Sequence, residues 1–144
     1  MRLPAGLSVA LGLAVAAPLA AADDFVVIVH QAMAGGNIRR SDLAAVFLKK
    51  APRWGNGALA VPVDQSGTSA VRKAFSDSVL RMPVTAAVQY WQKEMLSGSP
   101  LRPPSVKGSD AEVIAFVASR EGAVGYVSRG AALPPGVKAI DLIE

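Results

Sequence analysis

The stretch "VPVDQSGTSAVRKAF", residues 61–75, places a strand, a turn and a helix in direct succession. The apolar run at 59–63 predicts a strand, and apolar residues recurring between 71 and 79 predict a helix with one buried face. Between them, residues 66–69 supply small hydroxyl side chains and a glycine. Such a turn either caps the helix or holds an anion on the unpaired amides of the helix start. From these residues alone, both interpretations are open.

Strands and helices continue to alternate on both sides of this stretch. The apolar, β-branched run at 25–29 is typical of a strand buried on both faces, and further strands are predicted at 123–127 and 137–142. Residues 98–108 hold three prolines and are expected to form an extended loop. The resulting order, β-α-β-α-α-α-β-β, predicts an α/β layer architecture.

Three further helices follow from apolar spacing and capping signals. Ser41 is expected to cap a helix whose inner face is Leu43, Val46 and Phe47. A second helix begins near Pro83, and its stripe of Val84, Val88, Trp91 and Met95 is expected to be core, Trp91 included. The third opens with a capping box at 109–112.

The first 22 residues have the pattern of a secretory signal peptide. Arg2 precedes an apolar run at 7–17, and Ala20-Ala21-Ala22 matches a small-residue cleavage site. The run is too short for a membrane span, so a membrane contact is expected only before cleavage. We therefore expect a periplasmic protein with one domain at 23–144, although an uncleaved anchor is the alternative.

Composition narrows the function classes. Fifteen basic residues face 11 acidic ones, and the small excess is scattered, so no nucleic-acid surface is predicted. There is no cysteine for a disulfide. With His30 as the lone histidine, no metal site, cofactor or catalytic residue is predicted, and His30 is expected in a loop or at a sheet edge. A nucleophilic Ser66 would need a base within reach.

The turn at 66–69 carries the candidate binding residues. Ser66, Thr68 and Ser69 offer hydroxyl donors, and Gly67 allows a ligand to approach the backbone closely. Arg72, one turn into the helix, either leans back toward an anion or lies on a solvated face.

Three other polar or aromatic features have simpler interpretations. Trp54 is expected to be a packing anchor, and Asp23-Asp24 a solvated pair. The hydroxyl of Tyr126 either finds a partner or faces water.

Three stretches together resemble the phosphate-binding proteins of bacterial ABC importers. They are "SDLAAVFLKKAPRW" (41–54), "VDQSGTSAVRKAF" (63–75) and "SDAEVIAFVASREGAVGYV" (109–127). The match is to the second lobe of that family and covers about residues 25–130. It implies one lobe of a type II periplasmic-binding-protein fold, a mixed β-sheet flanked by helices.

The resemblance also implies a function. The family's phosphate-contacting Ser-Gly-Thr falls on Ser66, Gly67 and Thr68, and its preceding aspartate on Asp64, which would orient the turn or accept a proton from the ligand. Its arginine falls on Pro62, a departure for which Arg72 is a candidate replacement. Phosphate or a related oxyanion is the implied ligand, and an ABC permease or another periplasmic protein the implied partner. The alternative is an interaction module that keeps the lobe and has lost its ligand.

Overall fold

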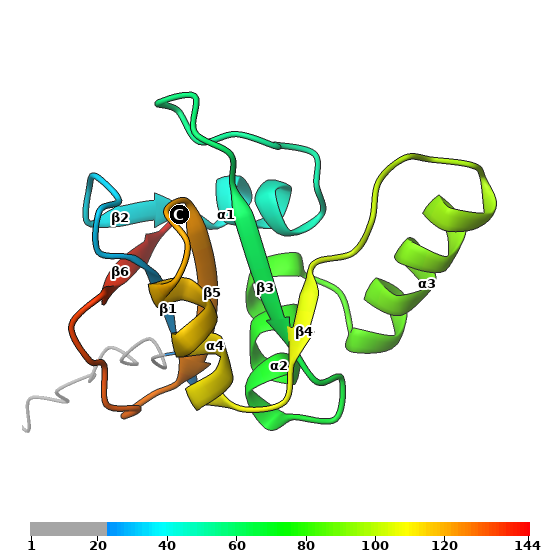
Figure 1. Cartoon of the computed structure of the whole chain (residues 1–144). Coiled ribbons are helices and arrows are strands. Elements are labelled where there is room, and N and C mark those ends of the chain that lie inside the picture. Colours follow the sequence, from blue (N-terminus) through cyan, green and yellow to red (C-terminus); the bar gives the residue numbers. More distant parts are fainter. Residues whose placement is uncertain (1–22) are drawn as a thin grey trace, which may run out of the picture.

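The computed structural model describes residues 23–144 and shows a mixed sheet flanked by helices (Figure 1). The predicted signal peptide, residues 1–22, lies outside the described residues. The strands are β1 (Phe25–His30), β2 (Asn37–Arg39), β3 (Val61–Gln65), β4 (Ser105–Lys107), β5 (Ala123–Ser128) and β6 (Val137–Ile143). The helices are α1 (Arg40–Phe47), α2 (Ala70–Phe75), which continues as a π-helical turn (Ser76–Leu80), α3 (Val84–Leu96) and α4 (Asp110–Ala118).

The sheet has the strand order β2-β6-β1-β5-β3-β4. Strand β1 pairs antiparallel with both β5 and β6, while β3 lies parallel to β5 and to β4. The central place of β1 confirms the prediction from its apolar run, because Val27, Ile28 and Val29 are all buried. The α/β prediction is also confirmed, with a mixed rather than a purely parallel sheet.

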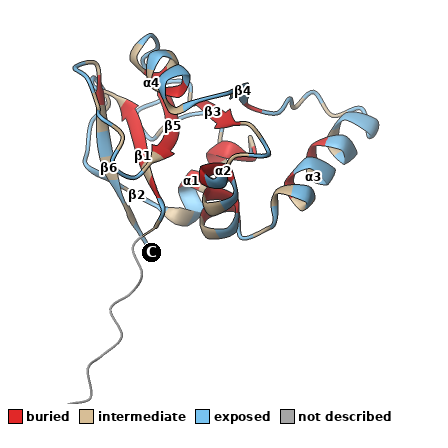
Figure 2. Cartoon of the chain, turned by 90° about the horizontal axis from the view of Figure 1, so that it is seen from below, coloured by how far each residue is buried: buried red, intermediate tan, exposed pale blue. Residues whose placement is uncertain are grey.

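Apolar clusters cover both faces of the sheet (Figure 2). On one face, Phe75 of α2 stacks on Tyr126 of β5, with ring centroids 3.9 Å apart. On the other, Val113 of α4 packs so closely on β5 that a Cβ at Gly125 would lie 2.7 Å from its Cγ1 atom. A glycine is required there because a Cβ would clash with the side chains of Val113 on α4 and Val63 on β3.

Several predicted boundaries are wrong. Helix α1 begins at Arg40, and its cap position, Arg39, makes no side-chain cap, so Ser41 is not the cap. Strand β3 begins at Val61, and Leu59 is exposed. Strands β2 and β4 were not predicted, and β4 lies inside the segment expected to be a loop. The Ser109 cap of α4 is confirmed, since its hydroxyl accepts from the Glu112 amide at 3.2 Å, whereas the Glu112 carboxylate accepts from the Gly108 amide at 2.7 Å and not from that of Ser109.

Helix α3 forms as predicted, and Trp91 is buried as expected, but the rest of its stripe is not. Trp91 is 8% exposed, whereas Val88 and Met95 are 47% and 52% exposed. The helix projects from the edge of the sheet near β4 instead of lying on the sheet (Figure 1). The residues of the apolar stripe line a recess.

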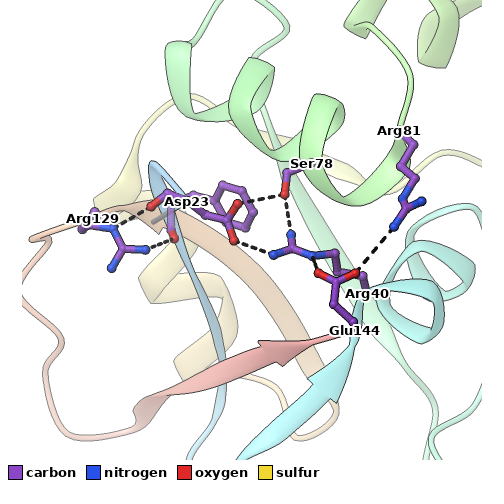
Figure 3. A network of polar contacts seen from close by, with 7 residues as sticks. Asp23, Arg40, Ser78, Arg81, Arg129 and Glu144 are labelled. Carbon is purple, nitrogen blue, oxygen red and sulfur yellow. Dashed lines mark hydrogen bonds and ion pairs between the residues drawn. The ribbon is translucent and has the colours of Figure 1, made fainter. Parts of the chain in front are cut away.

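The expectation of a solvated Asp23 is wrong, because this residue belongs to a network around Arg40 (Figure 3). Arg40 donates to Asp23 Oδ2 at 2.9 Å and to Glu144 Oε1 at 2.8 Å, and it also contacts Ser78. Arg129 donates to the Asp23 carbonyl at 2.6 Å. We call this group, with Arg81, the Arg40 network. It joins β1, α1 and the residue after β6.

No helix within residues 23–144 has the length and apolar character needed to cross a membrane.

Candidate functional site

The turn at 66–69 is fastened at both ends by backbone bonds. The Ser66 amide donates to the Lys107 carbonyl at 3.1 Å, and the Ser69 amide donates to the Ser66 carbonyl at 3.0 Å. Helix α2 is capped by Ser69, whose hydroxyl accepts from the Arg72 amide at 3.0 Å. The hydroxyls of Ser66 and Thr68 take no part in capping and lie 3.1 Å from each other.

The tip of this turn presents unused donors to solvent. Gly67 and Thr68 are exposed, and within residues 23–144 their amides have no hydrogen-bond acceptor. Gly67, Thr68 and Ser69 border a recess of about 360 Å³ together with Lys73 and the start of α3, which we call the turn recess. Within residues 23–144, Lys73 pairs with Asp77 at 2.6 Å, and Asp77 also borders the recess. The recess therefore combines backbone donors with an exposed pair of opposite charges.

Behind the turn lies a buried ion pair. Asp64 and Arg72 are 4% and 6% exposed, and the Arg72 Nη1 contacts Asp64 Oδ2. The interpretation of Arg72 as part of a solvated face is therefore wrong. Burial lowers the pKa of Arg72, but the charge and hydrogen bond of Asp64 outweigh this and raise it. Arg72 is thus a permanent cation matched by a carboxylate.

Tyr126 completes this pair from β5. Its hydroxyl donates to Asp64 Oδ1, which also accepts from the Gln65 amide at 3.1 Å. Burial, and then the Asp64 charge, raise the pKa of Tyr126 well above its ordinary value. The Tyr126 hydroxyl therefore has a hydrogen-bond partner and does not face water.

A second group of polar residues, unforeseen from the sequence, fixes the end of β3. The Gln65 Nε2 donates to Asp110 Oδ1 at 2.8 Å and to the Tyr126 carbonyl at 3.0 Å. Burial raises the pKa of Asp110, but the hydrogen bonds from Gln65 and Ser128 lower it by more. These bonds tie β3 to α4 and β5, so the turn starts from a rigid base.

The structure places five of the six predicted site residues at two recesses, and Ser66 borders neither. Gly67, Thr68 and Ser69 border the turn recess, whereas Asp64, Gly67 and Arg72 border a second recess of about 280 Å³. Ser66 contacts Thr68 at the base of the turn. Arg72 therefore borders a different recess from Thr68 and Ser69, and Gly67 is shared by both recesses.

Pro62 is accommodated in β3 without loss of a ladder bond. The Val61 amide donates to the carbonyl of Gly122, the residue before β5, at 3.0 Å, and β4 pairs only from Val63 onward. Because alternate residues of a strand bond to opposite sides, the Pro62 nitrogen points away from β5 to where β4 has not begun. Position 62 therefore carries no charge, although the resemblance implies an arginine there.

The other aromatic and histidine candidates lie away from the turn. His30 ends β1, which runs antiparallel to β5, whereas Ser66 follows the end of β3, which runs parallel to β5. His30 and Ser66 are therefore at opposite ends of the sheet, and His30 Nδ1 accepts from the Ala32 amide at 3.0 Å. The Trp54 indole donates to the Gly122 carbonyl at 2.8 Å, as expected of a packing anchor.

The described residues have the fold of a type II periplasmic-binding-protein lobe, an α/β class in which helices flank a mixed sheet. No family model and no curated protein matches the chain. Several solved structures match it in fold. An ABC-type phosphate transport receptor from Vibrio cholerae is 21% identical, with a TM-score of 0.60 over 83% of this chain and 46% of that one.

Two further solved structures agree. A phosphate ABC transporter substrate-binding protein with bound phosphate from Clostridium perfringens is 17% identical, with a TM-score of 0.63 over 83% of this chain and 45% of its own. PstS from Borrelia burgdorferi is 17% identical, with a TM-score of 0.64 over 83% and 47%. This chain spans less than half the length of each, and at these identities the likeness concerns the fold.

Proposed function

We propose that this protein binds a small oxyanion such as phosphate at the turn formed by Ser66, Gly67, Thr68 and Ser69. We place it in the periplasm as a solute-binding component of ABC-type uptake, with a permease as partner. Two of the solved structures of similar fold are named as a phosphate transport receptor and a phosphate ABC transporter substrate-binding protein, which supports this assignment.

The observation that carries the proposal is the set of free donors at the tip of the turn. The amides of Gly67 and Thr68 are exposed and unpaired within the described residues, and the hydroxyls of Ser66 and Thr68 are released from capping by Ser69. Converging amides at a helix start favour an oxyanion because each donates a hydrogen bond and the helix dipole adds a partial positive charge.

Asp64 and Arg72 support the turn from behind in this proposal. Their ion pair joins the end of β3 to the first turn of α2, so it sets the angle at which the turn leaves the sheet. The Arg72 charge is already matched by Asp64, and Pro62 adds none. The oxyanion therefore depends on neutral donors and on Lys73, and we expect weaker binding than a bidentate arginine would give.

Thermal unfolding of the purified protein with and without phosphate tests the proposal. A ligand at 100 times its dissociation constant adds roughly 2.7 kcal/mol of stability, and each kcal/mol moves the midpoint by about 4 °C in a domain of this size. We expect a rise approaching about 10 °C with phosphate. Sulfate and chloride at equal ionic strength control for salt effects, which phosphate must exceed.

A double variant at the turn tests where phosphate binds. Ser66→Ala combined with Thr68→Val removes both free hydroxyls and should abolish most of the phosphate-dependent rise. Ser41→Ala is the matched control, because Ser41 is exposed and does not cap α1. If wild-type protein shows no rise at millimolar phosphate, the second candidate, an interaction module without a ligand, takes precedence. Pro62 in place of the family's arginine is the feature that favours that candidate.

A further inference from the structure

A third recess, of about 430 Å³, lies between α1 and the π-helical turn that follows α2. We call it the α1 recess. Its apolar lining comes from both elements and includes two small side chains on α1, Ala44 and Ala45. Its polar members are Arg40, Ser41, Lys50 and Arg81. None of these residues belongs to the turn recess, so this recess is a separate feature of the molecule.

The α1 recess differs in charge from the two recesses near the turn. In each of those, a lysine or arginine is paired with a carboxylate of the same lining. The lining of the α1 recess has three cations, Arg40, Lys50 and Arg81, and no carboxylate. Two carboxylates, of Asp23 and Glu144, contact Arg40 without lining the recess, so the cations still exceed the carboxylates by one. This excess favours an anionic occupant.

Two of the three cations can bind a ligand. Each of the three guanidinium nitrogens of Arg40 already donates within the Arg40 network. Arg81, in contrast, is 73% exposed, and its side chain makes one ion pair within residues 23–144, to Glu144 at 3.6 Å. Lys50 is exposed, and its side chain has no acceptor in the part of the chain that the structure describes. A ligand would therefore be held by Arg81 and Lys50.

The backbone holds both of these cations in place beside the recess. Lys49, the residue before Lys50, and Arg81 have φ values of 60° and 55°, and no other non-glycine residue within 23–144 has a positive φ. Glycine usually takes this conformation at a helix end, because a Cβ makes it costly. The Lys50 amide donates to the Ala45 carbonyl at 2.8 Å, and the Arg81 amide donates to the Ser76 carbonyl. Both positions are therefore defined by main-chain contacts.

One carboxylate of the chain already contacts two residues of the lining (Figure 3). Glu144 Oε1 accepts from Arg40 Nε at 2.8 Å, and Glu144 Oε2 lies 3.6 Å from Arg81 Nη2. The Glu144 side chain is 76% exposed, and ion pairs in such contact with water are weak and exchange readily. A carboxylate from solution can therefore compete with Glu144 for Arg81.

The remaining lining favours a carboxylate that carries a carbon chain over an inorganic anion. The volume lies within the range of small-molecule pockets, roughly 300–1,000 Å³. The partly buried Ala44 and Ala45 occupy little space, and covering them removes apolar surface from water. An inorganic anion would use the cations and leave this surface uncovered.

We propose that the α1 recess binds a small carboxylate with a short aliphatic chain. Its carboxylate accepts hydrogen bonds from Arg81 and Lys50, and its chain packs on Ala44 and Ala45. Glu144 competes with this ligand for Arg81. The site does not rest on the proposed oxyanion function, since the two recesses share no residue.

Nuclear magnetic resonance of the Ala44 and Ala45 backbone amides is the direct test, with hexanoate as the probe. We expect hexanoate to shift both resonances with a millimolar dissociation constant, because so small a ligand gains little contact energy. Hexanamide, which lacks the charge, should bind about tenfold more weakly or worse. Acetate and phosphate, which lack the chain, should also bind several-fold more weakly.

Two variants at exposed positions localise the response. Arg81→Met should weaken hexanoate several-fold, and Arg102→Met is the matched control, because Arg102 is exposed and does not border the recess. Glu144→Gln removes the competing carboxylate and should strengthen hexanoate several-fold. A gain in affinity cannot result from partial unfolding, so this variant keeps the test independent of stability.

Four outcomes would overturn the proposal. The first is no shift of the Ala44 and Ala45 amides with hexanoate at tens of millimolar. The second is equal affinity for hexanamide, which would exclude a role for the cations. The third is equal affinity for acetate or phosphate, which would make the recess a general anion site. The fourth is unchanged hexanoate affinity in both Arg81→Met and Glu144→Gln.

Discussion

Two groups of charges hold this molecule together, and they differ in their access to water. Asp64 and Arg72 lie between the sheet and α2, with side chains only 6% and 7% exposed. The Arg40 network lies where β1, α1 and residue 144 meet, and the side chains of Arg40, Asp23 and Glu144 are 18%, 27% and 76% exposed (Figure 3). The first group is buried from water, and the second is partly hydrated.

This difference sets how much each group should matter. A partly hydrated ion that loses its partner is resolvated, so the loss is modest. A buried ion that loses its partner keeps its desolvation cost and gains nothing in return. The number of contacts is therefore a poor guide, because Arg40 has more partners than Arg72.

The largest effect is expected for Asp64→Asn, which leaves Arg72 charged and unpaired in the interior. We expect a loss of about 3–5 kcal/mol in the free energy of unfolding, measured by urea denaturation. Asp77→Asn removes a carboxylate from an exposed pair and serves as control. A loss below about 1 kcal/mol for Asp64→Asn would remove the distinction between the two groups.

Tyr126→Phe comes next, because it deprives the buried Asp64 of a donor. We expect a loss of about 1–3 kcal/mol at neutral pH. The pKa of Tyr126 is raised by folding, so its contribution is complete below the ordinary value of 10.0 and is lost as pH rises toward the folded value. Wild-type stability should therefore fall above pH 10 more steeply than that of Tyr126→Phe. Parallel slopes would contradict this.

Arg40→Met tests the hydrated group directly. We expect a loss of about 1–2 kcal/mol, since Asp23 and Glu144 regain water. The loss should shrink in high salt, because the network is open to screening, whereas the effect of Asp64→Asn should not. Urea denaturation at low and high ionic strength measures both. An Arg40→Met effect that is larger than that of Asp64→Asn would reverse the ranking.

Lys73→Met should have the smallest effect on stability, at most about 0.5 kcal/mol, because its pair with Asp77 is exposed. The same change should lower phosphate affinity several-fold if the turn recess holds the anion. Lys93→Met is the matched control, since Lys93 is exposed on α3 and does not border either recess. Calorimetric titration that shows equal affinity in all three proteins would exclude Lys73 from the site.

Elements with a strong local pattern could be predicted. The run at 25–29, the helix spacing of α1 and α3 and the cap at Ser109 are each visible within a few residues, because burial and capping impose a period or a fixed offset. Strands β2 and β4 have three residues each. They are strands only because β6 and β3 pair with them, so no local signal marks them.

In the candidate site, too, some features could be predicted from local sequence and others could not. The turn at 66–69 was recognisable because its donors are adjacent in the chain. The partners of Asp64 are not recognisable in this way, because Arg72 lies beyond the turn and Tyr126 lies on another strand, and only the fold brings the three together. The sequence raises the question of a partner for the Tyr126 hydroxyl, but nothing in it points to Asp64 as the acceptor.

By itself, the sequence determined the α/β class, the order of the main elements and the position of the turn, because these depend on neighbouring residues and their spacing. The tertiary structure alone decided that Arg72 is buried, that Asp23 joins a network and that the stripe on α3 faces a recess. Burial and charge pairing depend on segments that are distant in the chain, and their energies follow from solvent access, which local sequence does not encode.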